Sequence, residues 1–196
     1  MKKNNDLNRW EGRYQSGATG WDRGESSHNL AYWTDKKILK PCRILIPGCG
    51  NGYEVIALAK QGFDVVAIDI APTAIDNLQK ALDDENTTAG LILADFFEWQ
   101  PEQPFDAIYE QTSLCALPPT EWGMYESQLH KWLKPQGKIY AQFMQTGQEG
   151  GPPFHCPLNA MSDLFPKNRW HWSEEHISQK MEAGKTELLY ILEKIG

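Results

Sequence analysis

The sequence predicts an α/β fold in which a doubly wound, mostly parallel sheet is followed by a terminal antiparallel hairpin. Short apolar segments alternate with helical segments between residues 43 and 147, at the spacing of βαβ units. A glycine-rich turn, residues 48–52, joins the first of these strands to its helix. After Gly147 the alternation stops, and two further strand-like segments follow near the end of the chain.

In the alternating region the strands are short and apolar, and the helices carry an apolar stripe. The expected strands cover residues 43–47, 64–69, 91–93, 105–109 and 138–143. One expected helix ends near residue 61, before Gly62, a second begins at Pro72, and a third covers residues 121–133. The side chains expected to point inward are Val55, Ile56 and Ala59 in the first helix, Ile75, Leu78 and Leu82 in the second, and Trp122, Tyr125, Leu129 and Trp132 in the third.

The two ends of the chain differ from this alternating core. Residues 1–40 are polar with several glycines and aromatic residues, and we expect short helices over residues 8–15 and 30–39, joined by an irregular loop. Near the other end, a short helix over residues 157–165 precedes two strands, 169–176 or longer and 186–194, joined through Gly184. We therefore expect a single domain, residues 1–196, with an N-terminal helical lid (1–40), a core (43–147), and a substrate loop followed by the hairpin (148–196).

Composition limits the partners of the chain. Its 196 residues include 26 acidic and 19 basic residues, a net charge of −7, which disfavours nucleic acid as a partner. No apolar run approaches the roughly 20 residues that span a bilayer, and no secretory signal opens the sequence. The four cysteines are far apart, which favours reduced thiols over a disulfide framework or a zinc site. We expect a cytoplasmic monomer that acts on a small molecule, with no metal, no membrane and no nucleic acid.

The strongest local signal for binding is the turn that carries Gly48, Gly50 and Gly52. Glycine allows positive φ and lets a ligand approach the backbone closely, at the carboxyl end of the strand. Asp69 ends the next strand, where a carboxylate can accept hydrogen bonds from both hydroxyls of a ribose. Two structural alternatives remain open: an ordinary glycine-rich βα turn, and Asp69 as a cap for the helix that follows.

A third candidate element, Asp95-Phe96, follows the third strand and suits an adenine ring, or else it is a strand end with a buried Phe. The turn reads Gly-x-Gly-x-Gly, whereas the dinucleotide fingerprint is Gly-x-Gly-x-x-Gly. A pyrophosphate needs free amides and room at the helix start, but S-adenosylmethionine places an amino-acid tail there. The glycine spacing and the terminal hairpin therefore both favour S-adenosylmethionine, which makes residues 43–147 a nucleotide-binding core.

With these segments in view, the sequence resembles the thiopurine S-methyltransferase family, which includes thiol, thiocyanate and halide methyltransferases. The resemblance covers nearly the whole chain. Its more specific segments are Trp10-Glu11, the run from Thr19 to Gly24 and the Gly151-Pro152-Pro153-Phe154 loop. The other matching segments are residues 46–50, 109–118 and 133–138, of which the glycine turn is common to all methyltransferases of this fold.

The resemblance implies a Rossmann-like class I methyltransferase with S-adenosylmethionine as donor and S-adenosylhomocysteine as product. Trp10 and Trp21 match aromatic residues that close over the donor, although ordinary helix packing is the alternative. Gln111 departs from the Tyr or Arg of relatives, which leaves the acceptor open. The expected donor-binding residues are Trp10, Tyr14, Trp21, Gly48, Gly50, Asp69, Asp95, Phe96, Glu110 and Gln111.

The expected reaction is methyl transfer from S-adenosylmethionine to a small soft nucleophile, such as a thiol, a thiopurine or thiocyanate. A thiolate is already a strong nucleophile, so an essential base need not exist. Asp22, Gln111 and His155 are the candidate catalytic residues, and His28 and Glu110 are further polar candidates, all expected on loops near the strand ends.

Three alternatives to this reaction remain open. Selenium or tellurium oxyanions are soft and are possible acceptors for the same type of enzyme. A nicotinamide-dependent oxidoreductase is a second enzyme class on a similar fold, disfavoured by the glycine spacing. A non-catalytic nucleotide binder would retain the same pocket residues without turnover.

Overall fold

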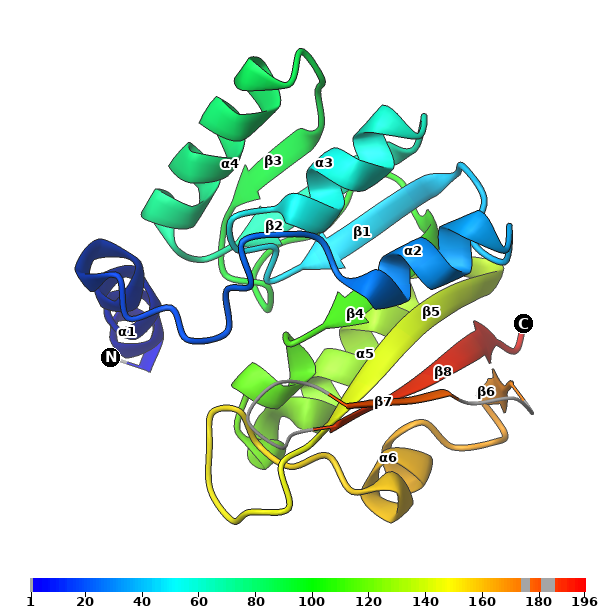
Figure 1. The fold of residues 1–196 in the computed structure, drawn as a ribbon. Helices are drawn as coiled ribbons and strands as arrows, with labels where there is room; N and C mark the ends of the chain where they lie inside the picture. Colours follow the sequence, from blue (N-terminus) through cyan, green and yellow to red (C-terminus); the bar gives the residue numbers. More distant parts are fainter. Residues whose placement is uncertain (1, 174–176, 181–185) are drawn as a thin grey trace. The chain divides into compact units, whose positions relative to one another are not determined.

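The computed structural model describes residues 2–173, 177–180 and 186–196, and gives no side-chain description for residues 2–5 and 177–180. The chain divides into two compact units, Met1–Gln100 and Pro101–Gly196. The expectation of a single domain stays a prediction. Figure 1 shows the elements along the chain, coloured from the N-terminus to the C-terminus.

The first unit is built on three parallel strands in the order β3-β2-β1. The strands are β1 (Arg43–Pro47), β2 (Asp64–Asp69) and β3 (Gly90–Leu93). The helices are α1 (Lys2–Ser16), α2 (His28–Asp35), α3 (Tyr53–Lys60) and α4 (Pro72–Asp84). Helices α3 and α4 contact the strands, and α1 contacts α4 (Figure 1). Strands β1 and β2 are buried along nearly their whole length, as their continuous apolar sequence predicts.

The second unit combines a parallel strand pair with an antiparallel tail. Parallel strands β4 (Phe105–Gln111) and β5 (Leu133–Gln145) are joined by two short 3₁₀ turns, η1 (Leu114–Ala116) and η2 (Pro119–Glu121), and by helix α5 (Trp122–Trp132). Helix α6 (Leu158–Leu164) follows β5. Strand β8 (Thr186–Lys194) then pairs antiparallel with β5, and β6 (Trp170–Trp172) and β7 (Ile177–Lys180) pair antiparallel with β8.

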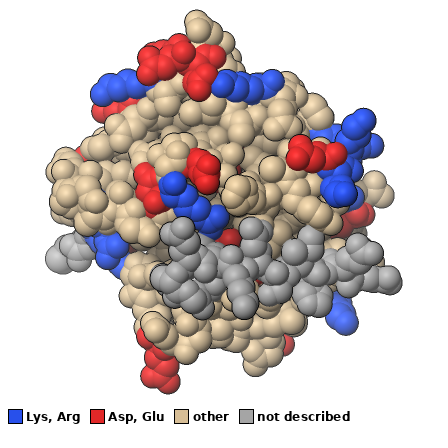
Figure 2. All heavy atoms as spheres, viewed as in Figure 1, with Lys and Arg blue, Asp and Glu red and all other residues tan. Residues whose placement is uncertain are grey.

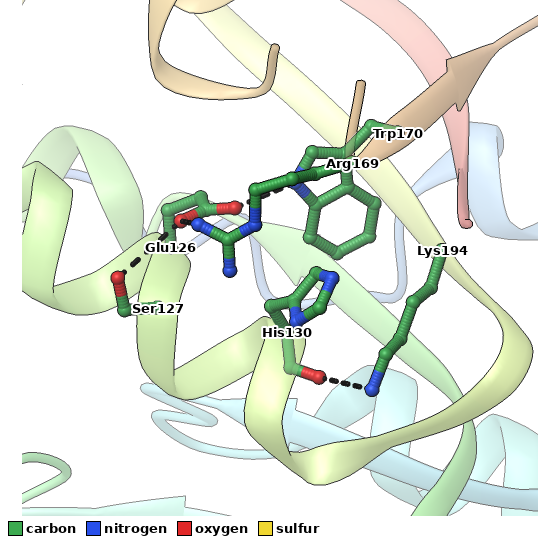
Figure 3. Close-up of polar contacts among 6 residues, drawn as sticks. All are labelled: Glu126, Ser127, His130, Arg169, Trp170 and Lys194. Carbon is green, nitrogen blue, oxygen red and sulfur yellow. Dashed lines mark hydrogen bonds and ion pairs between the residues drawn. The ribbon is translucent and has the colours of Figure 1, made fainter. Parts of the chain in front are cut away.

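A polar cluster fastens the tail of this unit to α5 (Figure 3). The buried Glu126 carboxylate accepts hydrogen bonds from the Trp170 indole (2.6 Å) and the Arg169 guanidinium (3.0 Å). Lys194 donates to the carbonyl of His130 (2.8 Å), close to the C-terminal end of α5, where a cation is favourable. Burial and the neighbouring cations lower the pKa of His130 to about 4, so its ring is neutral at pH 7. The cluster is a structural tie between α5, β6 and β8.

The fold class and the order of the elements confirm the sequence prediction, with local corrections. Helix α1 is longer than expected, α2 ends at Asp35 and not at residue 39, and β5 begins at Leu133 and not at residue 138. The tail contains three antiparallel strands where two were expected, since β6 and β7 are separate. The expected connection through Gly184 lies outside the described residues, as does the end of the first expected tail strand.

The predicted inward faces of the helices are correct for α5 and partly wrong for α3 and α4. All four predicted α5 side chains are buried. In α3 the buried residues are Val55 and Leu58, and Ile56 and Ala59 are only partly covered. In α4, Ala74 is buried and Ile75 is only partly covered. The reason is the same in both helices: the face packed against the strands includes Leu58 in place of Ala59 and Ala74 in place of Ile75, one position earlier in the sequence.

Four general features of the described residues are the distribution of surface charge, the state of the cysteines, the character of the helices and the grouping of potential metal ligands. On the face drawn in Figure 2, basic and acidic side chains lie next to one another. The four cysteines are free thiols, three of them buried. Among the described residues, no helix has both the length and the apolar character for crossing a membrane, and no group of potential ligands could hold a metal ion.

Candidate active site

The glycine turn after β1 has the backbone geometry that its sequence predicts. Gly48, Gly50 and Gly52 have φ values of +58°, +55° and +75°, a region that other residues rarely adopt. A Cβ atom at Gly52 would lie 2.2 Å from Leu78 Cδ1, and one at Gly50 would lie 2.9 Å from the hydroxyl of Tyr14. The turn therefore requires glycine at these two positions for space as well as for conformation.

Asp69 ends β2 and is tied to this turn. Its Oδ2 atom accepts a hydrogen bond from the Gly50 amide (2.9 Å), and its Oδ1 atom accepts one from the Ala71 amide (2.9 Å). Ala71 is itself the N-cap residue of α4, so Asp69 does not make the N-cap contact that was the structural alternative. Only 9% of Asp69 is exposed, and burial raises its pKa against the effect of the amide bonds. Each carboxylate oxygen retains acceptor capacity for a ligand at the turn.

Three aromatic residues of the N-terminal segment gather beside the turn. Trp21 packs edge-on against Trp10 (ring centroids 5.4 Å apart) and against Tyr14 (5.7 Å). Burial and the nearby Asp69 carboxylate raise the pKa of Tyr14, so its hydroxyl stays protonated at neutral pH. The structure thus brings Trp10, Tyr14, Trp21, Gly50 and Asp69 into one cluster.

Two carboxylates, Glu11 and Asp22, link this N-terminal segment to the rest of the first unit. Glu11 accepts hydrogen bonds from the amide (3.0 Å) and the hydroxyl (2.6 Å) of Thr73, in the first turn of α4. Asp22 accepts hydrogen bonds from the Asn51 side chain and from the Gly24 amide. Sequence reasoning gave no role to Glu11, Asn51 or Thr73, although Glu11 stands in a motif that carries the resemblance. The structure places Asp22 in a fastening contact, and its catalytic role stays a prediction.

Asp95 and Phe96 follow β3, as predicted, and form a local turn. The Oδ1 atom of Asp95 accepts a hydrogen bond from the Phe97 amide (2.9 Å). Phe96 packs edge-on against Phe97 at 5.5 Å between ring centroids. Both Asp95 and Phe96 are partly exposed, so Phe96 is not the buried strand-end residue of the structural alternative.

In the second unit, a short polar chain lies at the carboxyl end of β4. The Gln142 side chain on β5 donates to the hydroxyl of Tyr109 (2.8 Å), and that hydroxyl donates to Oε1 of Gln111 (2.9 Å). Gln111 is the last residue of β4 and is partly exposed. Sequence reasoning selected Gln111 but missed Tyr109 and Gln142, because their contact joins residues 33 positions apart.

Glu110 holds the turn that follows β4. It is 1% exposed, and its Oε1 atom accepts a hydrogen bond from the Leu114 amide (2.7 Å). Burial, with a smaller effect of Glu187, raises the pKa of Glu110 to about 7. The expectation that His28, Glu110 and Gln111 lie on loops is wrong, since Glu110 and Gln111 are the last two residues of β4 and His28 is the first residue of α2. Residues 107–110 of β4 are all buried, which removes Glu110 from solvent.

His155 is hydrogen-bonded to the first residues of the loop that follows β5. Its Nδ1 atom accepts hydrogen bonds from the amides of Thr146 (3.1 Å) and Gly147 (3.4 Å). The loop is also held by the Phe154 amide, which donates to the Cys115 carbonyl (2.7 Å). Because Nδ1 accepts these bonds, only Nε2 of a neutral ring carries a proton. The catalytic role of His155 stays a prediction.

The predicted residues thus fall into two groups, one in each unit. The turn, Asp69, Asp95, Phe96 and the aromatic residues belong to the first unit, and Glu110, Gln111 and His155 belong to the second. The first group offers the Asp69 carboxylate beside the glycine turn and a set of aromatic rings, of which Trp10 and Trp21 already contact the Arg13 guanidinium at 5.7 and 5.6 Å. Such a set suits a ribose-containing ligand that carries a positive charge.

Comparison with known proteins gives a consistent result. A family model described as thiopurine S-methyltransferase matches residues 5–194. A probable thiol methyltransferase 2 of Arabidopsis thaliana is 32% identical over 81% of this chain and 72% of its own. Thiocyanate methyltransferase 1 of Brassica oleracea is 30% identical over 80% of this chain and 70% of its own. Among solved structures, magnesium protoporphyrin IX methyltransferase of Synechocystis PCC 6803 with bound SAH has a TM-score of 0.78 at 13% identity, over 98% of this chain and 99% of its own.

Proposed function

The chain belongs to the thiopurine S-methyltransferase family and is an S-adenosylmethionine-dependent methyltransferase of thiol-type acceptors. From this premise we propose that it methylates a small soft anion, either thiocyanate or a thiolate. The observation that carries the proposal is the cluster of Gly50, Asp69 and the N-terminal aromatic residues at the turn after β1. The relatives named above support the choice of a sulfur nucleophile.

The first unit supplies the residues that hold the donor. Asp69 accepts hydrogen bonds from the ribose hydroxyls, and the donor lies beyond the carboxyl ends of the strands, beside the glycine turn. Asp95 and Phe96 receive the adenine, and Trp10, Tyr14 and Trp21 provide aromatic faces for a sulfonium cation. The residues fit the donor because two amides hold the Asp69 carboxylate beside the turn and each of its oxygens retains acceptor capacity.

The chemistry is a direct displacement. When bound, S-adenosylmethionine supplies a methyl carbon to which a sulfur lone pair of the acceptor bonds, while the electrons of the breaking S–CH₃ bond stay on the donor sulfur as a neutral thioether. The side chains around the reacting groups orient them and exclude water, and no protein side chain has to take a proton from an acceptor that is already anionic. The acceptor side is assigned to Gln111 and its neighbours in the second unit.

The test is methyl transfer from labelled S-adenosylmethionine, with thiocyanate, aromatic thiols, thiopurines, iodide, selenite and tellurite as acceptors. The proposal expects turnover of at least one sulfur anion, well above that of the selenium and tellurium oxyanions. Asp69→Asn should weaken donor affinity by about 10- to 100-fold, because a charge-assisted pair of hydrogen bonds to the ribose is lost. Asp64→Asn, at an exposed carboxylate on the same strand, is the matched control and should bind the donor normally. Oxyanion methylation without sulfur methylation would overturn the choice of acceptor.

We further propose that the protein acts as a cytoplasmic monomer and that residues 1–196 form one folding domain. Light scattering should then give the mass of a single 22.3 kDa chain, and both units should unfold in one cooperative transition. A dimer mass would contradict the first statement, and two separate transitions would contradict the second.

A further inference from the structure

The hydrogen-bonded chain from Gln142 through Tyr109 to Gln111 has a direction. The Gln142 amide group donates to the Tyr109 hydroxyl, and that hydroxyl donates its single proton to Oε1 of Gln111. A Gln side chain has one oxygen that accepts and one nitrogen that donates two hydrogen bonds. The Tyr109 hydroxyl therefore engages the accepting end of Gln111 and leaves the donating end, Nε2, for another partner.

The reverse orientation of Gln111 would break the hydrogen bond that it accepts from the Tyr109 hydroxyl. With Nε2 turned toward Tyr109, the hydroxyl oxygen would receive protons from two amides, and its own proton would lose the Gln111 acceptor. Tyr109 is 1% exposed and Gln142 is 2% exposed, so a lost hydrogen bond there is costly. The buried pair thus fixes how Gln111 is turned.

Gln111 stands where a ligand can use this orientation. It is the last residue of β4, and ligands of doubly wound sheets bind beyond the carboxyl ends of the strands. Unlike Tyr109 and Gln142, Gln111 is partly exposed. No described residue accepts a hydrogen bond from its Nε2 atom.

We propose that Tyr109 and Gln142 are positioning residues that hold the Gln111 amide as a hydrogen-bond donor toward the methyl acceptor, so that the site selects anionic acceptors over neutral ones. The inference rests on the proposed function and adds the residue that determines charge preference. Thiocyanate, which is anionic at every working pH, is the simplest acceptor that such a donor recognises.

A neutral donor suits this reaction better than a fixed cation. The acceptor gives its lone pair to the methyl carbon and loses its negative charge as the new bond forms, while the donor sulfur becomes neutral. A strong cation next to the acceptor would stabilise the anion before the reaction more than in the transition state, which slows the chemical step. An amide N–H group holds the anion with a weaker bond, so its effect should be on KM and on binding and only slightly on kcat.

The experiment compares the binding of two ligands that share the S–C≡N group, one anionic and one neutral. Thiocyanate and its neutral methylation product, methyl thiocyanate, are titrated into the protein saturated with S-adenosylhomocysteine. Tyr109→Phe, which releases Gln111, should weaken thiocyanate binding by about 10-fold and leave methyl thiocyanate within about twofold. Gln111→Glu, which keeps the shape and replaces the donor with a carboxylate, should weaken thiocyanate binding further, by about 100-fold or more, again without weakening methyl thiocyanate.

Tyr190→Phe, which removes the hydroxyl of a buried tyrosine on β8, is the matched control and should leave both ligands unchanged. In turnover, Tyr109→Phe should raise KM for thiocyanate and leave kcat within about threefold. Equal losses for both ligands, or no loss for either, would overturn the inference, as would a wild-type protein that does not bind thiocyanate. Failure of the proposed function is distinguishable, because the wild type would then transfer no methyl group to any of the sulfur anions in the acceptor screen.

Discussion

The contact between Glu11 and Thr73 makes a quantitative prediction about the N-terminal segment. Thr73 lies in the first turn of α4, where amides have no partner within the helix, and the N-cap residue Ala71 has no side-chain oxygen to offer. The Glu11 carboxylate supplies the missing acceptor from another helix and adds a negative charge at a helix N-terminus. Glu11→Gln should therefore release α1 without unfolding the unit.

The magnitude follows from the exposure of the contact. Two hydrogen bonds to a buried carboxylate would contribute several kcal/mol, but Glu11 faces solvent on one side, which reduces their sum to about 1 kcal/mol. That value corresponds to a roughly fivefold increase in the open population of α1. If α1 closes over the donor, the affinity for S-adenosylhomocysteine should fall by the same factor.

Hydrogen exchange of residues 6–16 is the assay, with Glu85→Gln as the control for loss of an exposed carboxylate in the same unit. The hydrogen bonds from Thr73 lower the pKa of Glu11 in the folded protein, against a raising effect of burial. The contribution of a carboxylate with a lowered pKa is present above its unfolded value and is lost as the pH falls through the folded value. Protection of residues 6–16, taken relative to the intrinsic exchange rate at each pH, should therefore fall in the wild type only below about pH 4.5, and unchanged protection in Glu11→Gln at pH 7 would refute the reasoning.

Three further predictions concern stability. Gly52→Ala should lower the free energy of unfolding by about 2–4 kcal/mol, because the added Cβ atom would clash with Leu78 and φ is positive at this position. The control Gly123→Ala, on the exposed face of α5, should be neutral or stabilising, and equal denaturant midpoints for the two variants would contradict this. Raising the pH from about 4.5 to about 7 should lower the free energy of unfolding of the wild type, since a carboxyl with a raised pKa stabilises the fold while it is protonated. Glu110→Gln should flatten this pH dependence in urea titrations, and a variant with the same pH dependence as the wild type would contradict its assignment to Glu110. Glu126→Ala should lower the free energy of unfolding by about 3 kcal/mol or more, because the Trp170 indole and the Arg169 guanidinium lose their acceptor. A loss below about 1 kcal/mol in thermal unfolding would contradict the role of Glu126 as a structural tie.

Sequence reasoning recovered most of the fold, for identifiable physical reasons. Strands β1 and β2 are continuous apolar runs bounded by turn residues, and both were predicted at their observed bounds. The early start of β5 was missed because Lys134, Pro135, Gln136 and Gly137 have the composition of a turn, although Leu133 pairs with Phe105 at the start of β4. The start of α1 was missed because its first residues are polar and show no helical periodicity.

The sequence predicted those residues of the candidate site that stand at a regular spacing in a local motif, and it missed the contacts between residues far apart in the sequence. The glycine turn and Asp69 stand at fixed distances along a βαβ unit, so their spacing alone identified them. The contacts of Glu11 with Thr73 and of Gln142 with Tyr109 join residues 62 and 33 positions apart, and no local pattern reports them. The hydrogen bonds of Asp22 to Asn51 and of His155 to Thr146 likewise appear only in three dimensions, and they fasten loops that carry the predicted residues.

The central claim is that the turn after β1, with Asp69, holds an adenosine that carries a sulfur substituent. A calorimetric titration of the full chain with S-adenosylhomocysteine, and in parallel with NADH, tests it most directly. The account predicts saturable one-to-one binding of S-adenosylhomocysteine at micromolar concentrations and no measurable binding of NADH. Binding of NADH without S-adenosylhomocysteine, or of neither ligand, would contradict it.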